Sequence, residues 1–212
     1  MSGDQRLGGK NMAVLSERWK NLKAVVYGEG ARENALVQWF QKYGCQTVQI
    51  PVGEITGCAD VLPWENLDIL VLGEPELAAK DMGNAEEIHR NFDSCINGAM
   101  CLISELLPYL DRGNRKRICF LTRCSASSNE SREIQLYPEN MIRASRNMLA
   151  VILKNRLEKE GYTFRICCME SVEESQNAVW YFLEDRSRDL CPVHEDERRL
   201  VMRDCCEREI PW

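Results

Sequence analysis

The sequence predicts an α/β protein, a single domain in which helices cover both faces of a mostly parallel sheet. From Lys23 onward, short apolar runs alternate with longer stretches of helical periodicity, a pattern typical of this class. The 212 residues are 44% hydrophobic and 28% charged, which supplies one sizeable core. No repeat or linker interrupts the pattern. We therefore expect residues 1–22 to form an N-terminal extension and residues 23–212 to form one doubly wound domain.

Three strands, a tight turn and a helix are expected in the first third of the chain. The strands are predicted at residues 23–27, 46–50 and 67–72. Gly28 and Gly30 form a turn after the first strand, and a helix over residues 31–43 ends at Gly44. Only the 15 residues 52–66 separate the last two of these strands. If residues 52–66 contained a further strand, the strand at 67–72 would be the fourth of the sheet. We therefore predict that the crossovers between strands 2 and 4 are shortened, and we leave open whether residues 52–66 form a third strand.

Two long helices, over residues 84–110 and 138–159, are expected in the rest of the chain. The first carries apolar residues at helical spacing and is expected to end at Pro108. Pro138 suits the first turn of the second helix. The remaining elements are predicted strands at 117–122, 163–169 and 199–203 and a predicted helix at 172–183.

Charge and hydropathy disfavour two classes of partner. The 33 acidic and 27 basic side chains give a net charge of −6, and this surplus of negative charge disfavours nucleic acid and anionic lipid as main partners. No run approaches the roughly 18 apolar residues that a membrane-spanning helix needs. Residues 1–20 are polar and charged and do not read as a secretion signal. We expect a cytoplasmic protein, without a membrane partner, that binds small molecules or other proteins.

The eleven cysteines predict reduced, buried thiols rather than a disulfide framework, because they lie within apolar segments. There is no CxxC motif, and the adjacent pair Cys167-Cys168 would point to opposite faces of a strand. A zinc site built from Cys191, His194 and one of the cysteines at 205–206 lacks a fourth ligand. We therefore predict no metal site.

Four stretches of the sequence follow one another in an order found in a known family. They are Lys23–Ala35 as first strand and glycine-rich turn, Leu67–Val71 as a strand, Leu106–Leu110 with Arg117–Leu121 as helix end and strand, and Ala144–Leu149 within a helix. In this order the chain resembles the short-chain dehydrogenases/reductases over nearly all of Lys23–Trp212. The resemblance implies a Rossmann-like fold, and it implies NAD(P) as the cofactor of a hydride transfer.

The resemblance also assigns residues to a cofactor site. Gly28 stands at the first glycine of the dinucleotide turn and Gly30 is a near neighbour, but the later glycines are replaced by Arg32 and Asn34. The side chain of Arg32 could contact a phosphate, and Asp60 resembles the aspartate on the adenine side. If a nucleotide binds, we expect Gly28, Gly30, Arg32 and Asp60 to bind it.

The catalytic positions depart further from the family. The resemblance places Glu139 where the family has its tyrosine and Arg143 where it has its lysine, and this pair reads as an ion pair on a helix surface. Ser125 can stand for the catalytic serine, and Cys95 replaces an active-site asparagine. A shifted helix start would let Tyr137 act instead of Glu139. If the protein is an enzyme, the expected catalytic residues are therefore Tyr137, Arg143 and Ser125.

We expect from these joint departures that the protein has lost hydride transfer and acts as a non-catalytic module that forms oligomers or binds a ligand. Helices 84–110 and 138–159 are the expected interface, with a second copy or with an active relative. The second helix has more apolar residues than one buried stripe needs, although these residues could instead widen a single core. The alternative function is that of a divergent NAD(P)-dependent oxidoreductase.

Overall fold

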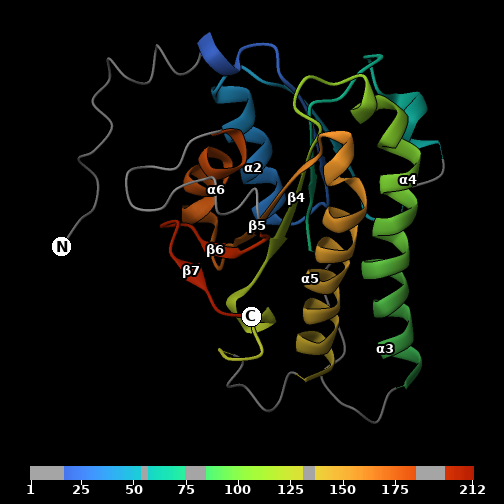
Figure 1. Cartoon of the computed structure of the whole chain (residues 1–212), viewed down its shortest axis with the longest axis vertical. Coiled ribbons are helices and arrows are strands. Elements are labelled where there is room, and N and C mark those ends of the chain that lie inside the picture. Colours follow the sequence, from blue (N-terminus) through green and yellow to red (C-terminus); the bar gives the residue numbers. More distant parts are fainter. Residues whose placement is uncertain (1–16, 54–56, 75–84, 131–136, 185–198) are drawn as a thin grey trace.

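A computed structural model confirms the α/β class and the mostly parallel sheet (Figure 1). The structure describes residues 17–53, 57–74, 85–130, 137–184 and 199–212. Its sheet has the strand order β2-β1-β3-β4-β5-β6-β7, in which all neighbours are parallel except β6 and β7. The strands are β1 (Lys23–Tyr27), β2 (Gln46–Ile50), β3 (Ile69–Leu72), β4 (Arg117–Thr122), β5 (Thr163–Cys168), β6 (Met202–Asp204) and β7 (Glu209–Ile210).

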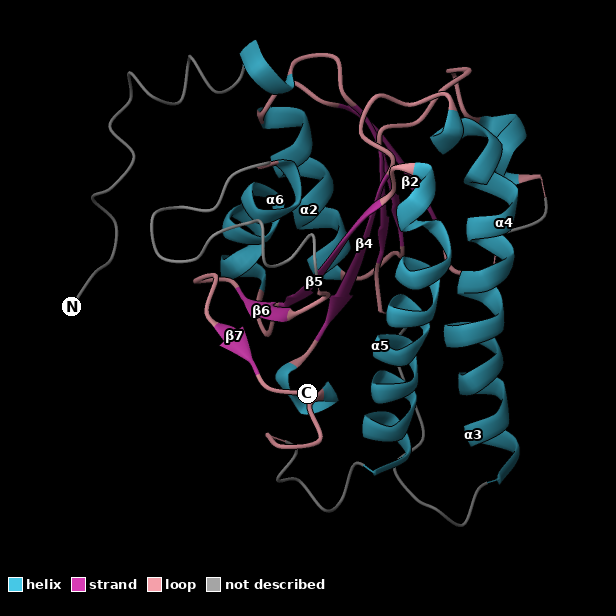
Figure 2. Cartoon of the chain, viewed as in Figure 1, coloured by secondary structure: helices cyan, strands magenta, loops and turns pink. Residues whose placement is uncertain are grey.

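Helices cover both faces of this sheet, as Figures 1 and 2 show. One face carries α2 (Ala31–Lys42) and α6 (Ser175–Leu183), and the other carries α3 (Ala85–Phe92), α4 (Gly98–Asp111) and α5 (Tyr137–Leu157). Alternating strand residues supply two cores, so that Val25 packs toward α4 and α5 while its neighbour Val26 packs toward α2 and α6. No described helix combines the length and the hydropathy needed to cross a bilayer.

The shortened crossover is confirmed in the described part of the segment between β2 and β3. There, residues 51–53 and 57–68 contain one short 3₁₀ helix, η1 (Cys58–Val61), and no strand. β2 therefore pairs with β1 alone among the described strands. The carboxyl ends of β1, β3, β4 and β5 lie along one edge of the sheet, which we call the carboxyl edge.

The predicted helix over residues 84–110 is in fact three consecutive pieces. α3 is followed by a π-helical segment, η2 (Asp93–Asn97), and then by α4. The prediction that Pro108 ends this helix is wrong, because α4 continues to Asp111. A proline in the last turn removes one backbone hydrogen bond, and the buried Leu106 and Leu110 hold that turn against the sheet.

Two further elements differ from the prediction near the C-terminus. The predicted helix 172–183 begins as a 3₁₀ turn, η6 (Val172–Glu174), which a capping box of Ser171 and Glu174 starts. The last predicted strand, at 199–203, begins only at Met202 and is followed by the unexpected hairpin strand β7.

Residues 17–22 join the domain rather than lead up to it. Trp19 is fully buried and packs edge-on against Tyr43 and Trp180, with ring centroids 5.2 and 4.9 Å away. The predicted N-terminal extension therefore contributes a core residue on the face that α2 and α6 cover.

Candidate functional site

The turn between β1 and α2 opens the carboxyl edge. Gly28 has a φ of +132°, a conformation that favours glycine. Its N–H donates to the carbonyl of Ile50 at 2.9 Å, and its carbonyl accepts from the Gln49 amide at 2.7 Å. α2 begins directly after Gly30, so the predicted glycine turn and helix start are both present.

The space that these glycines leave is filled by the chain itself. The side chain of Glu33, on the first turn of α2, is buried. A Cβ built on Gly28 would lie 2.6 Å from the Glu33 Cγ, and one built on Gly30 would lie 2.7 Å from its Oε2. Gly73, just after β3, is equally close to the same Cγ. The three glycines therefore accommodate a carboxylate side chain of this protein.

A second buried carboxylate, Glu74, stands directly after β3 and Gly73. Its side chain is 2% exposed, and its oxygens lie 2.6 Å from Arg143 Nε, 3.1 Å from Arg32 Nη2 and 3.5 Å from Arg123 Nε. Burial alone would raise the pKa of Glu74, but the charges of Arg143, Arg146 and Arg32 lower it below its usual value. Glu74 is therefore an anion held by several cations.

Arg32 extends from the first turn of α2 across the carboxyl edge. Besides its ion pair with Glu74, its Nη1 donates to the carbonyl of Met169 at 3.0 Å, just after β5. The side chain is 13% exposed. The residue predicted to contact a phosphate is thus engaged by the protein's own carboxylate and carbonyl.

Arg143 contacts two other residues that the resemblance singled out, Ser125 and Glu139. Its Nη2 lies 3.1 Å from the Glu139 carboxylate, and its Nη1 donates to the Ser125 hydroxyl at 3.3 Å. Both Arg143 and Glu139 are buried, so the predicted surface ion pair exists but lies inside the protein. The reason is that this side of α5 faces the carboxyl edge, where Glu74 takes up the remaining charge. Tyr137 is the first residue of α5, and its side chain lies outside what the structure describes.

These side chains form one connected set, which we call the carboxyl-edge cluster. Its members are Arg32, Glu74, Arg123, Ser125, Glu139 and Arg143. Asp60, predicted to bind the adenine side of a nucleotide, lies exposed in η1 and is not a member. The structure therefore brings Arg32, Arg143 and Ser125 together and leaves Asp60 apart.

Sequence reasoning missed Glu33, Glu74 and Arg146. The buried Arg146 of α5 donates to the carbonyls of Leu72, Gly73 and Leu121, and so binds the ends of β3 and β4. For Glu74 alone a signal was available, a charged residue just beyond a buried strand, because side chains there meet at the edge where doubly wound folds bind ligands.

Cys95, the residue in place of the family's asparagine, is buried in the π-helical segment η2. Burial raises its pKa, and the charges of Arg146, Glu74 and Arg143 act on it. Cys95 is therefore close to the carboxyl-edge cluster. π-helical turns recur at functional sites, which supports the choice of this edge as the candidate site.

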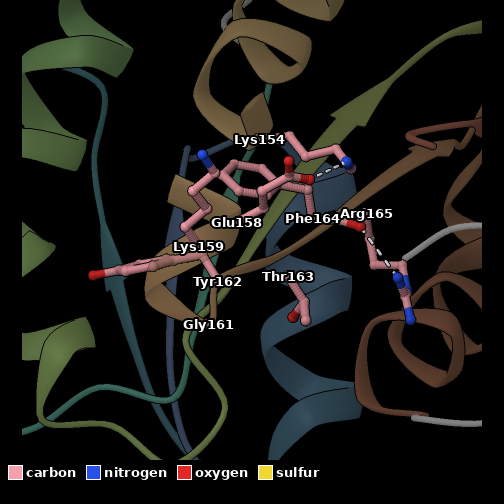
Figure 3. Close-up of a pocket in the computed structure, with 8 residues that line it drawn as sticks. All are labelled: Lys154, Glu158, Lys159, Gly161, Tyr162, Thr163, Phe164 and Arg165. Carbon is pink, nitrogen blue, oxygen red and sulfur yellow. Dashed lines mark hydrogen bonds and ion pairs between the residues drawn. The ribbon is translucent and has the colours of Figure 1, made fainter. Parts of the chain in front are cut away.

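Other candidate sites are weaker in the described residues. No group of three or more His, Cys, Asp or Glu side chains there could hold a metal ion, and Cys191 and His194 lie outside the described residues. A cavity of about 400 Å³ opens at the amino end of β5. Figure 3 shows that its side chains diverge: Tyr162 and Arg165 point in opposite directions, and Lys154 is bound to Glu158. This cavity lacks the convergent polar groups of a ligand site.

Comparisons with known proteins identify the fold. No protein-family model matches the sequence, and no curated protein matches it. A carbonyl reductase from Pseudomonas aeruginosa PAO1 in complex with NADP matches with a TM-score of 0.71 at 15% identity, over 91% of this chain and 100% of that one. The ligand-free aldohexose dehydrogenase of Thermoplasma acidophilum matches with a TM-score of 0.71 at 11% identity, over 89% and 94%. The chain has the fold of the short-chain dehydrogenases/reductases.

A third solved structure matches the same fold. A protein from Burkholderia multivorans assigned to the short-chain dehydrogenases/reductases, with bound NADP, matches with a TM-score of 0.69 at 14% identity, over 91% of this chain and 100% of that one. Within this fold, Arg143 contacts both Ser125 and Glu139.

Proposed function

We propose that this short-chain dehydrogenase-like protein has lost hydride transfer and acts as a non-catalytic module. The single observation that carries the proposal is the buried Glu74 carboxylate, bound to Arg143 at 2.6 Å and to Arg32 at 3.1 Å. Doubly wound folds bind dinucleotides at this edge of the sheet. Here ion pairs of the chain itself take up that place, and this arrangement supports a binding role without hydride transfer.

The side chains at the carboxyl edge do not fit a dinucleotide. Glu33 lies against Gly28 and Gly30, where a glycine turn otherwise admits a pyrophosphate. Glu74 adds a second buried carboxylate, and two phosphates beside two carboxylates repel each other. Arg32, Arg123 and Arg143 are cations that could offset this repulsion, but all three are bound to Glu74, and Arg32 is also bound to the carbonyl of Met169. No hydride-transfer step follows from such a site.

Calorimetric titration with NADH and with NADPH tests this proposal. We expect no saturable heat of binding up to about 1 mM nucleotide, because the nucleotide would have to displace buried ion pairs. A reductase of the same fold, titrated in parallel, serves as the positive control. Saturable binding that weakens in Arg32→Ala would contradict the proposal.

We also propose that the module assembles through the outer faces of α4 and α5. On α5, Met141, Met148 and Ile152 are 65%, 59% and 56% exposed, and they lie seven and four residues apart on one face. Phe92 and Met100, on α3 and α4, are exposed as well. Large apolar side chains gathered on neighbouring helices are typical of interfaces, and an isologous contact with a second copy would cover both sets.

Light scattering tests the assembly. We expect the unchanged protein to be a dimer or larger at micromolar concentration and Met148→Glu to be a monomer, because a buried unpaired carboxylate opposes association. Gln38→Glu, an exposed change on α2 at the other face of the sheet, should leave the mass unchanged. A monomeric unchanged protein would contradict assembly with a second copy. A complex of the two proteins in a mixture with an active relative would instead indicate the hetero-oligomer.

A second candidate function is that of a divergent NAD(P)-dependent oxidoreductase. The comparisons support this candidate more than the first, because solved structures of the same fold contain bound NADP. The hydrogen bond between Arg143 and Ser125 at 3.3 Å adds support, because both could bind a substrate oxygen. The ion pairs of the carboxyl-edge cluster support the first candidate. The shared fold does not decide between the two, because a fold alone does not determine chemistry.

Turnover separates the two candidates. The residues of the second candidate are Tyr137, Arg143 and Ser125 for catalysis and Gly28, Gly30, Arg32 and Asp60 for the nucleotide. It predicts oxidation of NADPH in the presence of small aldehydes or ketones, measured by absorbance, with a loss of rate in Ser125→Ala. The first candidate predicts no oxidation above the rate without protein.

A further inference from the structure

Two buried cysteines of neighbouring strands have their sulfurs in contact. Cys167 is in β5, and Cys205 follows directly after β6. The two Sγ atoms are 3.9 Å apart, although the two positions are 38 residues apart along the chain. Both residues are free thiols in this structure. Their proximity was not predicted, because each cysteine was taken as an isolated small apolar residue.

Strand alternation explains why these two sulfurs meet. β5 and β6 are parallel neighbours, and Cys167 lies opposite Arg203 in their register. Cys205 is two residues beyond Arg203 and therefore points to the same face of the sheet. Both cysteines pack in the core that α2 and α6 cover, whereas Cys168 packs in the core on the α5 face. The predicted opposite orientation of Cys167 and Cys168 is thus confirmed.

A disulfide between these sulfurs requires only a short approach. A disulfide bond is about 2.05 Å long, so the two sulfurs have to come closer by about 2 Å. Cys205 lies in the turn between β6 and β7 and is not among the residues that pair in the sheet. The turn can therefore supply this movement while β6 stays paired with β5.

The two thiols differ in exposure and in protonation. Cys167 is fully buried, whereas Cys205 is 6% exposed and is followed by the exposed Cys206. The hydrogen bond with Cys205 and burial raise the pKa of Cys167 well above its usual value, so Cys167 stays protonated at neutral pH. The Cys205 thiol lies 3.8 Å from the carboxylate of the half-buried Glu174, which can accept its proton. An oxidant from the solvent therefore reaches Cys205 first.

The short strands around Cys205 determine the size of oxidant that can enter. β6 pairs with β5 over three residue pairs, and β7 pairs with β6 over two. A hairpin with so few pairs should open at a lower free energy than the central strands of the sheet. A small opening admits a molecule close to the size of water, such as hydrogen peroxide, and excludes a bulky disulfide.

We propose that hydrogen peroxide oxidises Cys167 and Cys205 to a disulfide, which fastens the β6–β7 hairpin to β5. The Cys205 thiolate attacks one peroxide oxygen and breaks the O–O bond. The sulfur becomes a sulfenic acid, and the released hydroxide becomes water with the proton that the thiol gave up. The Cys167 sulfur then attacks the Cys205 sulfur, so that the S–S bond forms and the S–O bond breaks. The leaving hydroxide becomes water with the Cys167 proton. The two thiols lose two electrons, and the peroxide gains them.

Hydrogen peroxide, applied to the full chain at pH 7 and then removed with catalase, tests this inference. After alkylation of the remaining thiols, peptide mapping by mass spectrometry should find a Cys167–Cys205 bridge that dithiothreitol reverses. Cys205→Ser should abolish the bridge, although its hydroxyl can still donate to the carbonyl of Cys168, as the thiol does at 3.1 Å. Cys206→Ser, the matched change at the next and exposed position, should leave the bridge intact.

Urea unfolding of the unchanged protein adds a measurement that needs no variant. The bridge joins positions 38 residues apart, so the oxidised protein should unfold at a midpoint about 1 M urea higher than the reduced protein. Oxidation of the exposed Cys101 and Cys206 without a Cys167–Cys205 bridge would overturn the inference. So would a bridge between Cys205 and Cys206 or between Cys167 and Cys119 in its place, or a bridge without a rise in the midpoint.

Discussion

At the residue scale, the carboxyl-edge cluster depends on one carboxylate. Glu74 is the residue on which Arg32, Arg123 and Arg143 converge, and each guanidinium reaches it from a different element. Burial of an unpaired charge costs several kcal/mol, so the cations and the anion need each other to remain inside the protein. The same network binds α2 to α5 across the sheet.

Glu74→Gln should therefore destabilise the fold by about 3 kcal/mol, since Arg143 and Arg32 would lose their buried counter-charge. Urea unfolding followed by circular dichroism measures the change. The matched control is Glu17→Gln, which removes an exposed ion pair with Lys20 and should have a much smaller effect. Equal losses in the two variants would show that the cluster adds no more than a surface pair.

Acid should remove the contribution of Glu74. Its pKa is lowered in the folded protein, so its stabilisation is complete above the unfolded value of about 4.3 and is lost as the pH falls through the folded value. The difference in unfolding free energy between the unchanged protein and Glu74→Gln should thus shrink below about pH 4. Denaturant titrations at a series of pH values measure it, and a difference that stays constant into strong acid would contradict the ion pairing.

The same scale explains which site residues the sequence could predict. Arg32, Ser125 and Arg143 were found because they stand at positions of a known motif order. Glu74 was missed because the resemblance assigns no charged group to the position after that strand. Its partners lie 42 and 69 residues away along the chain, and local periodicity carries no information about such contacts.

At the element scale, the interrupted helix from α3 to α4 departs most from its prediction. Helical periodicity cannot distinguish a continuous helix from one with a π-helical turn, since both keep apolar residues on one side. Pro108 was taken as a stop signal, but the buried face of α4 outweighs the lost backbone hydrogen bond. Tertiary packing decides where this helix ends.

Pro108→Ala should stabilise the protein by about 1–3 kcal/mol, because alanine restores the N–H and removes the clash with the preceding turn. Pro138→Ala is the matched control, since Pro138 lies in the first turn of α5, where no backbone bond is lost. Urea unfolding should show a gain for the first variant only. A loss of stability in Pro108→Ala would mean that the proline is required for the packing of α4.

At the scale of the whole molecule, the fold was predictable and its use was not. Alternating apolar runs placed β1, β2 and β4 at their observed bounds, because buried parallel strands need continuous apolar residues. General handedness and connection rules then limit the strand orders that such a sheet can adopt. The function depends instead on a few side chains at one edge, where a change of residue type leaves the core pattern intact.

The central claim is that ion pairs of the chain take the place of a dinucleotide at the carboxyl edge. A crystal structure determined from crystals grown in the presence of NADPH tests this claim most directly. The account predicts Glu74 still bound to Arg32 and Arg143, with no nucleotide at the turn of Gly28. A nicotinamide ring beside Tyr137, with Arg32 turned away from Glu74 toward the phosphates, would contradict it.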